Sequence, residues 1–281
     1  MSHLILSHFQ VEPLFKLRSS LPATVEISTD LGLSKTNFNL AEGGLVLPDW
    51  ESLTWPLLEE IAANPNSCFT WDGEKLGKAA FFSEQSGRLY SLYPTTAAPS
   101  MLVSGIPMHR IKGTTPDRDT QEKLKAAGSP HGAALDTCTG LGYTAIAAAR
   151  TANRVLTIEL DPAVLQLASQ NPWSAELFKN PRIEQRVGDS SQVLEQLGDG
   201  VFSWVLHDPP MLALAGDLYG IEYYHQLYRV MRPGGKLYHY IGDPDSSSGA
   251  RVMRGVVQRL AQARFRDIQR RPRAFGVTAL K

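Results

Sequence analysis

The 281-residue sequence has no net charge, two cysteines and no long hydrophobic run. Lysine plus arginine equals aspartate plus glutamate at 28 each, so overall charge does not favour nucleic acid as a partner. A local basic patch remains compatible with such a partner. No apolar stretch approaches the roughly 18 residues of a membrane helix, and the N-terminus lacks a signal-peptide pattern. We therefore expect no membrane association and a cytoplasmic protein.

The two cysteines, Cys68 and Cys138, lie far apart, which favours a reducing compartment over a disulfide framework. No histidines and cysteines have the spacing of metal ligands, so we expect no metal site. Hydrophobic residues make up 43% and charged residues 20%, as in ordinary globular proteins. The length allows one large domain, or a medium domain with a small one.

Residues 1–110 predict a small β-rich domain with one helix. Short apolar runs are separated by the turn pairs Asp72-Gly73 and Ser86-Gly87. Six aromatic residues are candidates for a base-stacking surface, but core packing is the favoured interpretation. They are Trp50, Trp55, Phe69, Trp71, Phe81 and Phe82. This domain is expected to present a substrate, to act as a lid or to mediate homo-oligomerisation.

Residues 111–281 predict a second domain, which begins with a strand, a glycine loop and a helix. The apolar run Ala133–Asp136 ends in an acid, passes Gly140 and Gly142, and becomes an alanine-rich helix over 143–151. Glycines let the backbone approach a ligand closely, and the helix N-terminus adds unpaired N–H groups. Alone, this pattern fits NAD, FAD or S-adenosylmethionine.

Strands and helices alternate through the rest of the chain, which predicts an α/β fold with a Rossmann-like, doubly wound sheet. Glu159 ends the second strand, 23 positions after Asp136, where a carboxylate accepts hydrogen bonds from ribose hydroxyls. Asp189 follows the third strand and is placed to accept from an adenine amino group. Asp208-Pro209-Pro210 follows the fourth strand, a fifth strand is expected over 237–241, and residues 265–269 and 274–279 are expected to close the sheet.

This part of the chain resembles the class I S-adenosylmethionine-dependent methyltransferases. The resemblance rests on Asp136-x-x-x-Gly140-x-Gly142, Glu159, Gly188-Asp189, Asp208-Pro209-Pro210 and the segment 227–235. It is closer to a group of predicted archaeal-type methyltransferases, through residues 135–144, 171–174, 207–210 and 215–219. Thr139 departs from the general family, which often has glycine there.

The resemblance implies S-adenosylmethionine as cofactor. The residues that it assigns to cofactor binding are Asp136, Thr137, Gly140, Gly142, Tyr143, Thr144, Glu159, Leu160, Asp189 and Ser190. A dehydrogenase is disfavoured, because dinucleotide sites usually place the first glycine directly after the strand, where Asp136 stands here. In methyltransferases the matching acid faces the cationic methionine part, where a pyrophosphate would be repelled.

The resemblance also implies that Asp208, Pro209 and Pro210 are catalytic. The Asp208 carboxylate and the Pro209 carbonyl would accept the two N–H groups of an amine, leaving its lone pair directed at the methyl carbon. The alternative is a rigid turn that Asp208 merely caps. His207 and His239 are candidate general bases, but structural roles are favoured for both. Met211 occupies the position where nucleic-acid amino-methyltransferases typically carry an aromatic residue.

The leading hypothesis is therefore methylation of an amino nitrogen, with RNA as the leading substrate class. A basic stripe from Lys16, Arg18, Lys35, Arg110, Lys112 and Lys123 would favour RNA. The alternatives are a small-molecule or protein N-methyltransferase, an aminopropyl transferase similar to spermidine synthase, and a non-catalytic S-adenosylmethionine-binding protein. Asp117, Asp119 and Asp208 keep an acidic polyamine site open. Asp119 and Thr120 are expected to cap a helix over 121–127.

Overall fold

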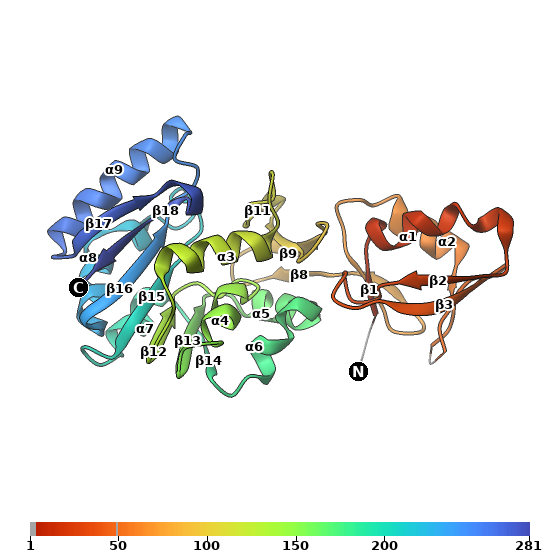
Figure 1. Cartoon of the computed structure of the whole chain (residues 1–281), viewed down its shortest axis with the longest axis horizontal. Helices are drawn as coiled ribbons and strands as arrows, with labels where there is room; N and C mark the ends of the chain where they lie inside the picture. Colours follow the sequence, from red (N-terminus) through yellow and green to blue (C-terminus); the bar gives the residue numbers. More distant parts are fainter. Residues whose placement is uncertain (1–3, 49) are drawn as a thin grey trace. The chain divides into compact units, whose positions relative to one another are not determined.

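The computed structural model describes residues 4–48 and 50–281, which divide into two compact units (Figure 1). Residues 1–3 and 49 lie outside the described residues. The first unit holds the chain up to Asp117 together with Ala163–Ala175, and the second holds Arg118–Pro162 and Glu176–Lys281. No helix among the described residues is long and apolar enough to cross a membrane.

The first unit is built on three small antiparallel sheets, in agreement with the predicted β-rich N-terminal part. Their strand orders are β1-β6-β7, β2-β3-β4-β5 and β11-β10-β9-β8. The strands are β1 (Leu4–Leu6), β2 (Ala23–Ile27), β3 (Thr36–Ala41), β4 (Gly44–Val46), β5 (Leu53–Thr54), β6 (Phe69–Trp71), β7 (Leu76–Lys78), β8 (Ala80–Ser83), β9 (Arg88–Tyr93), β10 (Ser100–Val103) and β11 (Ile106–Pro107). The helices are α1 (His8–Phe15), η1 (Arg18–Ser20) and α2 (Trp55–Ala62).

The aromatic residues of this unit mostly form core, in agreement with the favoured interpretation. Trp55, Phe69 and Trp71 are buried in one cluster with leucines and isoleucines of α1, α2 and the strands. The buried indole N–H groups are satisfied by backbone: Trp55, for example, donates to the Glu42 carbonyl. Phe82 is the exception, because 64% of it is exposed.

The second unit is organised by a seven-stranded sheet with the order β14-β13-β12-β15-β16-β18-β17. All neighbouring pairs are parallel except those of β18, which runs antiparallel to both β16 and β17. The strands are β12 (Ala133–Asp136), β13 (Arg154–Glu159), β14 (Ile183–Val187), β15 (Phe202–His207), β16 (Met231–Tyr240), β17 (Arg266–Arg271) and β18 (Gly276–Leu280). The predicted Rossmann-like α/β fold is confirmed.

Helices cover the sheet because its central strands are apolar on both faces; all six residues of β15 are buried. The helices α7, α8 and α9 pack in one hydrophobic cluster with the sheet. On the opposite face the Trp204 indole donates to the carbonyl of Gly128, the residue after α3. The helices of the second unit are α3 (Pro116–Ala127), α4 (Tyr143–Ala148), α6 (Ala175–Lys179), α7 (Ser190–Glu195), η3 (Gly216–Tyr219), α8 (Ile221–Val230), α9 (Ser247–Gln262) and η4 (Pro272–Ala274). The helices α5 (Pro162–Gln170) and η2 (Pro172–Ser174) lie, from Ala163 on, in the segment that belongs to the first unit.

Candidate functional site

The predicted site residues gather at the carboxyl ends of adjacent parallel strands. Asp136 ends β12, Glu159 ends β13 and Asp208 follows β15, and β12 lies between β13 and β15. The chain crosses from one side of β12 to the other here, since β13 and β14 lie on one side and β15 and β16 on the other. In open α/β sheets, ligands bind at such a switch point.

The glycine loop between β12 and α4 uses its two glycines for different purposes. Gly142 has a φ of +79°, and a Cβ on it would lie 2.7 Å from the Leu177 side chain. Gly140 has a φ of +52°, and a Cβ there would meet no atom within 4 Å. Gly142 is therefore required for close packing inside the protein, whereas Gly140 borders open space.

Asp136 is completely buried, and one of its oxygens is fully engaged. Its Oδ2 accepts hydrogen bonds from the hydroxyls of Thr144 and Thr157, each at 3.0 Å. Its Oδ1 has no hydrogen-bond partner among the described residues. Burial raises the pKa of Asp136 to about 8, because a carboxylate without water is costly. A buried carboxyl oxygen of this kind suits a cationic ligand group.

Glu159 joins the end of β13 to the glycine loop. Its Oε2 accepts from the Gly140 amide at 2.8 Å, and its Oε1 accepts from the Asp161 amide at 3.2 Å. Burial raises the pKa of Glu159 to about 7, while the backbone amides oppose that rise. Leu160 follows with 52% of its surface exposed.

The hydroxyl groups of the loop hold it to the sheet. Thr137 pairs with His207 Nδ1 at 2.7 Å, and Thr139 pairs with Thr157 at 2.7 Å. The second contact explains the departure at Thr139: its hydroxyl ties the loop to β13, which glycine cannot do. Tyr143, the first residue of α4, is 8% exposed.

Asp189 and Ser190 form the start of α7. One Asp189 oxygen accepts from the amides of Ser191 and Gln192, at 2.8 and 3.2 Å, so Asp189 is the N-cap of this helix. The Ser190 hydroxyl is bonded to the Tyr223 hydroxyl at 2.7 Å. Capping keeps the Asp189 carboxyl at the end of β14, where the adenine interaction was predicted.

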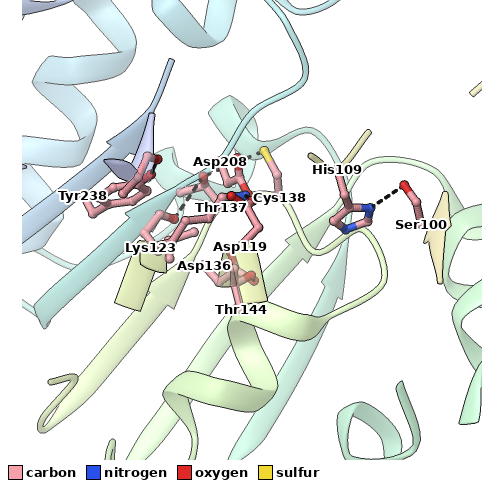
Figure 2. Close-up of polar contacts among 12 residues, drawn as sticks. Ser100, His109, Asp119, Lys123, Asp136, Thr137, Cys138, Thr144, Asp208 and Tyr238 are labelled. Carbon is pink, nitrogen blue, oxygen red and sulfur yellow. Dashed lines mark hydrogen bonds and ion pairs between the residues drawn. The ribbon is translucent and has the colours of Figure 1, made fainter. Parts of the chain in front are cut away.

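Asp208 forms an ion pair with Lys123 of α3, at 2.6 Å between Nζ and Oδ2 (Figure 2). The same ammonium lies 3.0 Å from Asp119 Oδ2 and 4.4 Å from the centre of the Tyr240 ring. The side chains of Lys123 and Asp119 are 4% and 1% exposed, whereas that of Asp208 is 19% exposed. Of the three charged groups, Asp208 is therefore the one that is most accessible to a ligand.

The charges in this cluster stabilise one another. Burial disfavours the ammonium of Lys123, but the carboxylates of Asp208 and Asp119 outweigh burial and raise its pKa. Burial raises the pKa of Asp208, and Lys123 opposes that rise. Lys123 therefore helps to keep Asp208 a carboxylate, which accepts hydrogen bonds but donates none.

Pro209 and Pro210 continue the chain from Asp208 into an exposed loop. The Tyr219 hydroxyl donates to the Pro210 carbonyl at 3.1 Å, which ties the loop to η3. Met211 is 52% exposed. Tyr219, Tyr223 and Tyr224 are all buried, in agreement with the packing roles favoured for them.

His207 and His239 lie in the interior beneath Asp208. His207 Nε2 pairs with the Leu218 carbonyl at 2.9 Å, and Thr137 occupies its other nitrogen. Burial lowers the pKa of His207 to about 3 and also lowers that of His239. Both rings are neutral and weakly basic, which favours the structural roles expected for them.

Three details of the sequence interpretation are corrected by α3. The helix begins at Pro116, so Asp119 and Thr120 lie inside it and do not cap it. Lys123 is buried and cannot belong to a surface stripe. Asp119 is paired with Lys123, so it is not an open carboxylate of a polyamine site. Pro116 carried the missing signal, since proline favours the first turn of a helix.

Comparison with known proteins places the chain in a family. Uncharacterized protein MJ1233 of Methanocaldococcus jannaschii is 41% identical over 232 residues, which cover 82% of this chain and 78% of that protein. The chain belongs to the MJ1233 family. No protein-family model matches the sequence.

The fold of this MJ1233 relative is similar to those of solved spermidine synthase structures. A spermidine synthase in complex with the transition-state analogue AdoDATO aligns with a TM-score of 0.52 and 15% identity. The spermidine synthase of Thermotoga maritima aligns with a TM-score of 0.52 and 16% identity. Each alignment covers 66% of this chain but only 62% and 64% of the synthases, less than two thirds of their length. At this level of identity, these likenesses show the fold alone, which the second unit shares with the spermidine synthases.

Proposed function

We propose that this protein transfers a methyl group from S-adenosylmethionine to an amino nitrogen, with RNA as the leading class of acceptor. The observation that carries the proposal is the convergence of Asp136, Glu159 and Asp208 at the switch point of the sheet. Two of these acids suit the cofactor, and the third suits an amine.

The residues present fit the proposed cofactor. Asp136 offers a buried oxygen without a hydrogen-bond partner among the described residues to a cationic amino-acid group. Glu159 would accept hydrogen bonds from the ribose hydroxyls, and Asp189 would accept one from the adenine amino group. The open space beside Gly140 admits the ligand next to backbone N–H groups at the start of α4. The remaining predicted contacts, Thr137, Gly142, Tyr143, Thr144, Leu160 and Ser190, form or border this loop and its neighbouring turns. When bound, the cofactor supplies a methyl group on a positively charged sulfur.

The Asp208 segment would orient the acceptor. The Asp208 carboxylate and the Pro209 carbonyl would each accept one N–H of the amine, which leaves the nitrogen lone pair free for the methyl carbon. Two consecutive prolines stiffen the segment, and the Tyr219 hydroxyl holds it at Pro210. As the new N–C bond forms, Asp208 is placed to accept the proton that the nitrogen loses.

The aminopropyl-transfer alternative is not favoured by the charge arrangement. A polyamine needs open carboxylates, but Lys123 lies between Asp119 and Asp208 and pairs with both. The ammonium would repel a second cation from this position. A neutral amine, such as an exocyclic amino group of a base, carries no such penalty.

The proposal is tested with Asp208→Ala and, as a matched control, Glu195→Ala on the exposed end of α7. Calorimetry measures S-adenosylmethionine binding, and tritiated-methyl cofactor measures transfer to extract fractionated into RNA, protein and small molecules. We expect Asp208→Ala to bind cofactor as before and to lose transfer to RNA. Full transfer by that variant would refute the assignment of Asp208, and label in small molecules or protein alone would refute RNA.

A further inference from the structure

The last 35 residues of the chain are strongly basic although the whole chain is neutral. Residues 247–281 contain nine basic side chains and a single acid, Asp267. The basic residues are Arg251, Arg254, Arg259, Arg264, Arg266, Arg270, Arg271, Arg273 and Lys281. These residues form α9, the edge strand β17, η4 and β18. These elements lie together at one edge of the second unit (Figure 1), so nine of the chain's 28 lysines and arginines belong to this edge.

Most of these side chains face solvent without compensation. Arg251, Arg254, Arg264, Arg266 and Arg270 are exposed, and none forms an ion pair with an acid among the described residues. Neighbouring uncompensated charges of one sign repel each other, which disfavours the fold unless a ligand of opposite charge balances them.

The strand order places part of this charge beside the Asp208 site. Because β18 is antiparallel to both its neighbours, β17 runs in the same direction as β16. Arg271 pairs with Gly276, which pairs with Tyr240, the residue whose ring lies against Lys123. The end of β17 is therefore two strand spacings, roughly 10 Å, from the end of β16.

The start of α9 lies at the same edge, because the chain passes from the end of β16 to α9 through only six residues, 241–246. Arg251 and Arg254 in the first half of α9, with Arg270 and Arg271 at the end of β17, thus share the edge that carries the candidate site. Arg273 follows in η4 and is also exposed. We name these five arginines the carboxyl-edge cluster.

A groove beside β17 holds further charged side chains. It has a volume of about 370 Å³, and Lys125, Lys236 and Arg271 line it together with Asp267, Gln269 and Thr278; Lys125 is paired with Glu122 at 2.7 Å. Arg271 donates through Nε to the Thr278 hydroxyl of β18 at 3.0 Å and through Nη2 to Gln269 Oε1 at 2.7 Å, which holds its side chain against the sheet. Cations of α3 and β16 thus border the same edge strand as the arginines of the cluster.

We propose that the carboxyl-edge cluster binds the phosphate backbone of RNA and delivers the nucleotide to be methylated to Asp208. This inference rests on the proposed function and adds the surface that recognises the acceptor. Arginine forms two parallel hydrogen bonds to a phosphate, and a row of arginines accommodates successive phosphates. The positive edge thereby supplies the attraction to RNA that the neutral whole chain lacks.

Two other roles of the carboxyl-edge cluster, protection of a free sheet edge and binding to a membrane, agree less well with its residues than RNA binding does. Charged side chains on β17 protect a free sheet edge from pairing with another chain, but this does not account for Arg251 and Arg254 on α9. An anionic membrane would need apolar side chains between the charges. Among the described residues of 247–281, no large hydrophobic side chain is exposed.

The experiment compares two triple variants with equal change in charge. The first is Arg251→Glu with Arg254→Glu and Arg270→Glu. The control is Arg150→Glu with Arg154→Glu and Lys179→Glu, three exposed residues from the half of the unit that holds β13 and β14. Fluorescence anisotropy follows binding of a labelled mixed-sequence RNA of about 30 nucleotides between about 50 and 200 mM salt.

We expect the carboxyl-edge variant to bind RNA at least about tenfold more weakly, with a salt slope reduced by about two, because each lost phosphate contact removes about 0.7. The control should change affinity less than about twofold. Equal weakening by both variants, or no weakening by the first, would overturn the proposal. So would unchanged RNA affinity with lost binding to phosphatidylserine vesicles or to a poly-glutamate peptide.

The binding measurement uses neither cofactor nor methyl transfer, so its failure is distinct from failure of the proposed function. Circular dichroism establishes that both variants fold; if the first does not, Arg251→Gln with Arg254→Gln replaces it. With an active preparation, the carboxyl-edge variant should raise KM for RNA and leave kcat unchanged. A reduced kcat with unchanged KM would contradict a docking role.

Discussion

Lys123 Nζ lies 2.6 Å from Asp208 Oδ2, and this ion pair joins α3 to the segment that follows β15. Lys123 is buried and also contacts Asp119 at 3.0 Å. The proposed acceptor-binding carboxylate is therefore held by a lysine that lies in the protein interior. Lys123 opposes the rise in the pKa of Asp208 that burial causes, and the ion pair restricts the direction of the carboxylate; both effects suit a group that must orient an amine.

Replacement of Lys123 by methionine should be strongly destabilising. It leaves Asp119 and Asp208 close together without a counter-charge, and breaking a buried pair from one side typically costs about 3–5 kcal/mol. Urea unfolding measures the loss. Lys123→Met combined with Asp208→Asn should recover part of it, because one of the uncompensated charges is then absent. Equal stability of Lys123→Met and the unchanged protein would contradict the burial of this charge cluster.

Replacement of Glu159 separates its structural role from its proposed ligand role. Glu159→Ala should weaken S-adenosylmethionine binding by about 1.5–3 kcal/mol, as expected for a lost charge-assisted hydrogen bond. Glu159→Gln retains an oxygen for the Gly140 amide and should lose less stability than Glu159→Ala. Calorimetry measures the affinity and thermal unfolding measures the stability. Unchanged cofactor affinity in Glu159→Ala would exclude the ribose role.

Stability should decrease as pH rises through the neutral range. Asp136 ionises near its ordinary pKa of 3.8 in the unfolded chain, but its pKa in the folded protein is about 8. Between these values the folded state holds the proton and the unfolded state does not, so raising the pH lowers the free energy of unfolding. Glu159, with a pKa of about 7, contributes in the same direction.

Urea unfolding between pH 5 and pH 9 checks this linkage, with Asp136→Asn as the comparison. The variant cannot ionise at this position and should show a weaker loss of stability with pH. The affinity for a cationic cofactor should change in the opposite direction and increase as Asp136 loses its proton. Parallel stability curves for the two proteins would show that Asp136 is ionised throughout.

The two loop glycines should respond differently to alanine. Gly142→Ala places a Cβ 2.7 Å from Leu177 at a φ of +79°, so we expect it to cost about 1–3 kcal/mol of stability. Gly140→Ala has open space, so its stability should change by only about 1 kcal/mol while cofactor binding weakens. Thermal unfolding and calorimetry on both variants distinguish these effects. A larger cofactor-binding loss in Gly142→Ala than in Gly140→Ala would contradict the division of roles.

The elements that the sequence predicted well are those specified by short-range patterns. The run Ala133–Asp136, the two glycines and the start of the next helix at Tyr143 occupy the predicted places, although this helix ends at Ala148 and not at 151. Asp136, Glu159 and Asp189 also lie at or just after the ends of β12, β13 and β14, because hydrophobic periodicity placed the ends of these strands correctly. Thr139 is the instructive exception, since its partner Thr157 lies on the next strand and no local pattern reveals the hydroxyl pair.

The sequence by itself determined the order of strands and helices, the glycine loop and the acids at strand ends, because hydrophobic periodicity and backbone freedom act over a few residues. Only the tertiary structure decided that Lys123 meets Asp208, 85 residues away, and that α3 buries it. The arginines of 251–273 are visible in the sequence, yet their position beside the site depends on β17 running parallel to β16. Long-range pairing sets these relationships, since ion pairs and strand neighbours are chosen by packing of the whole sheet.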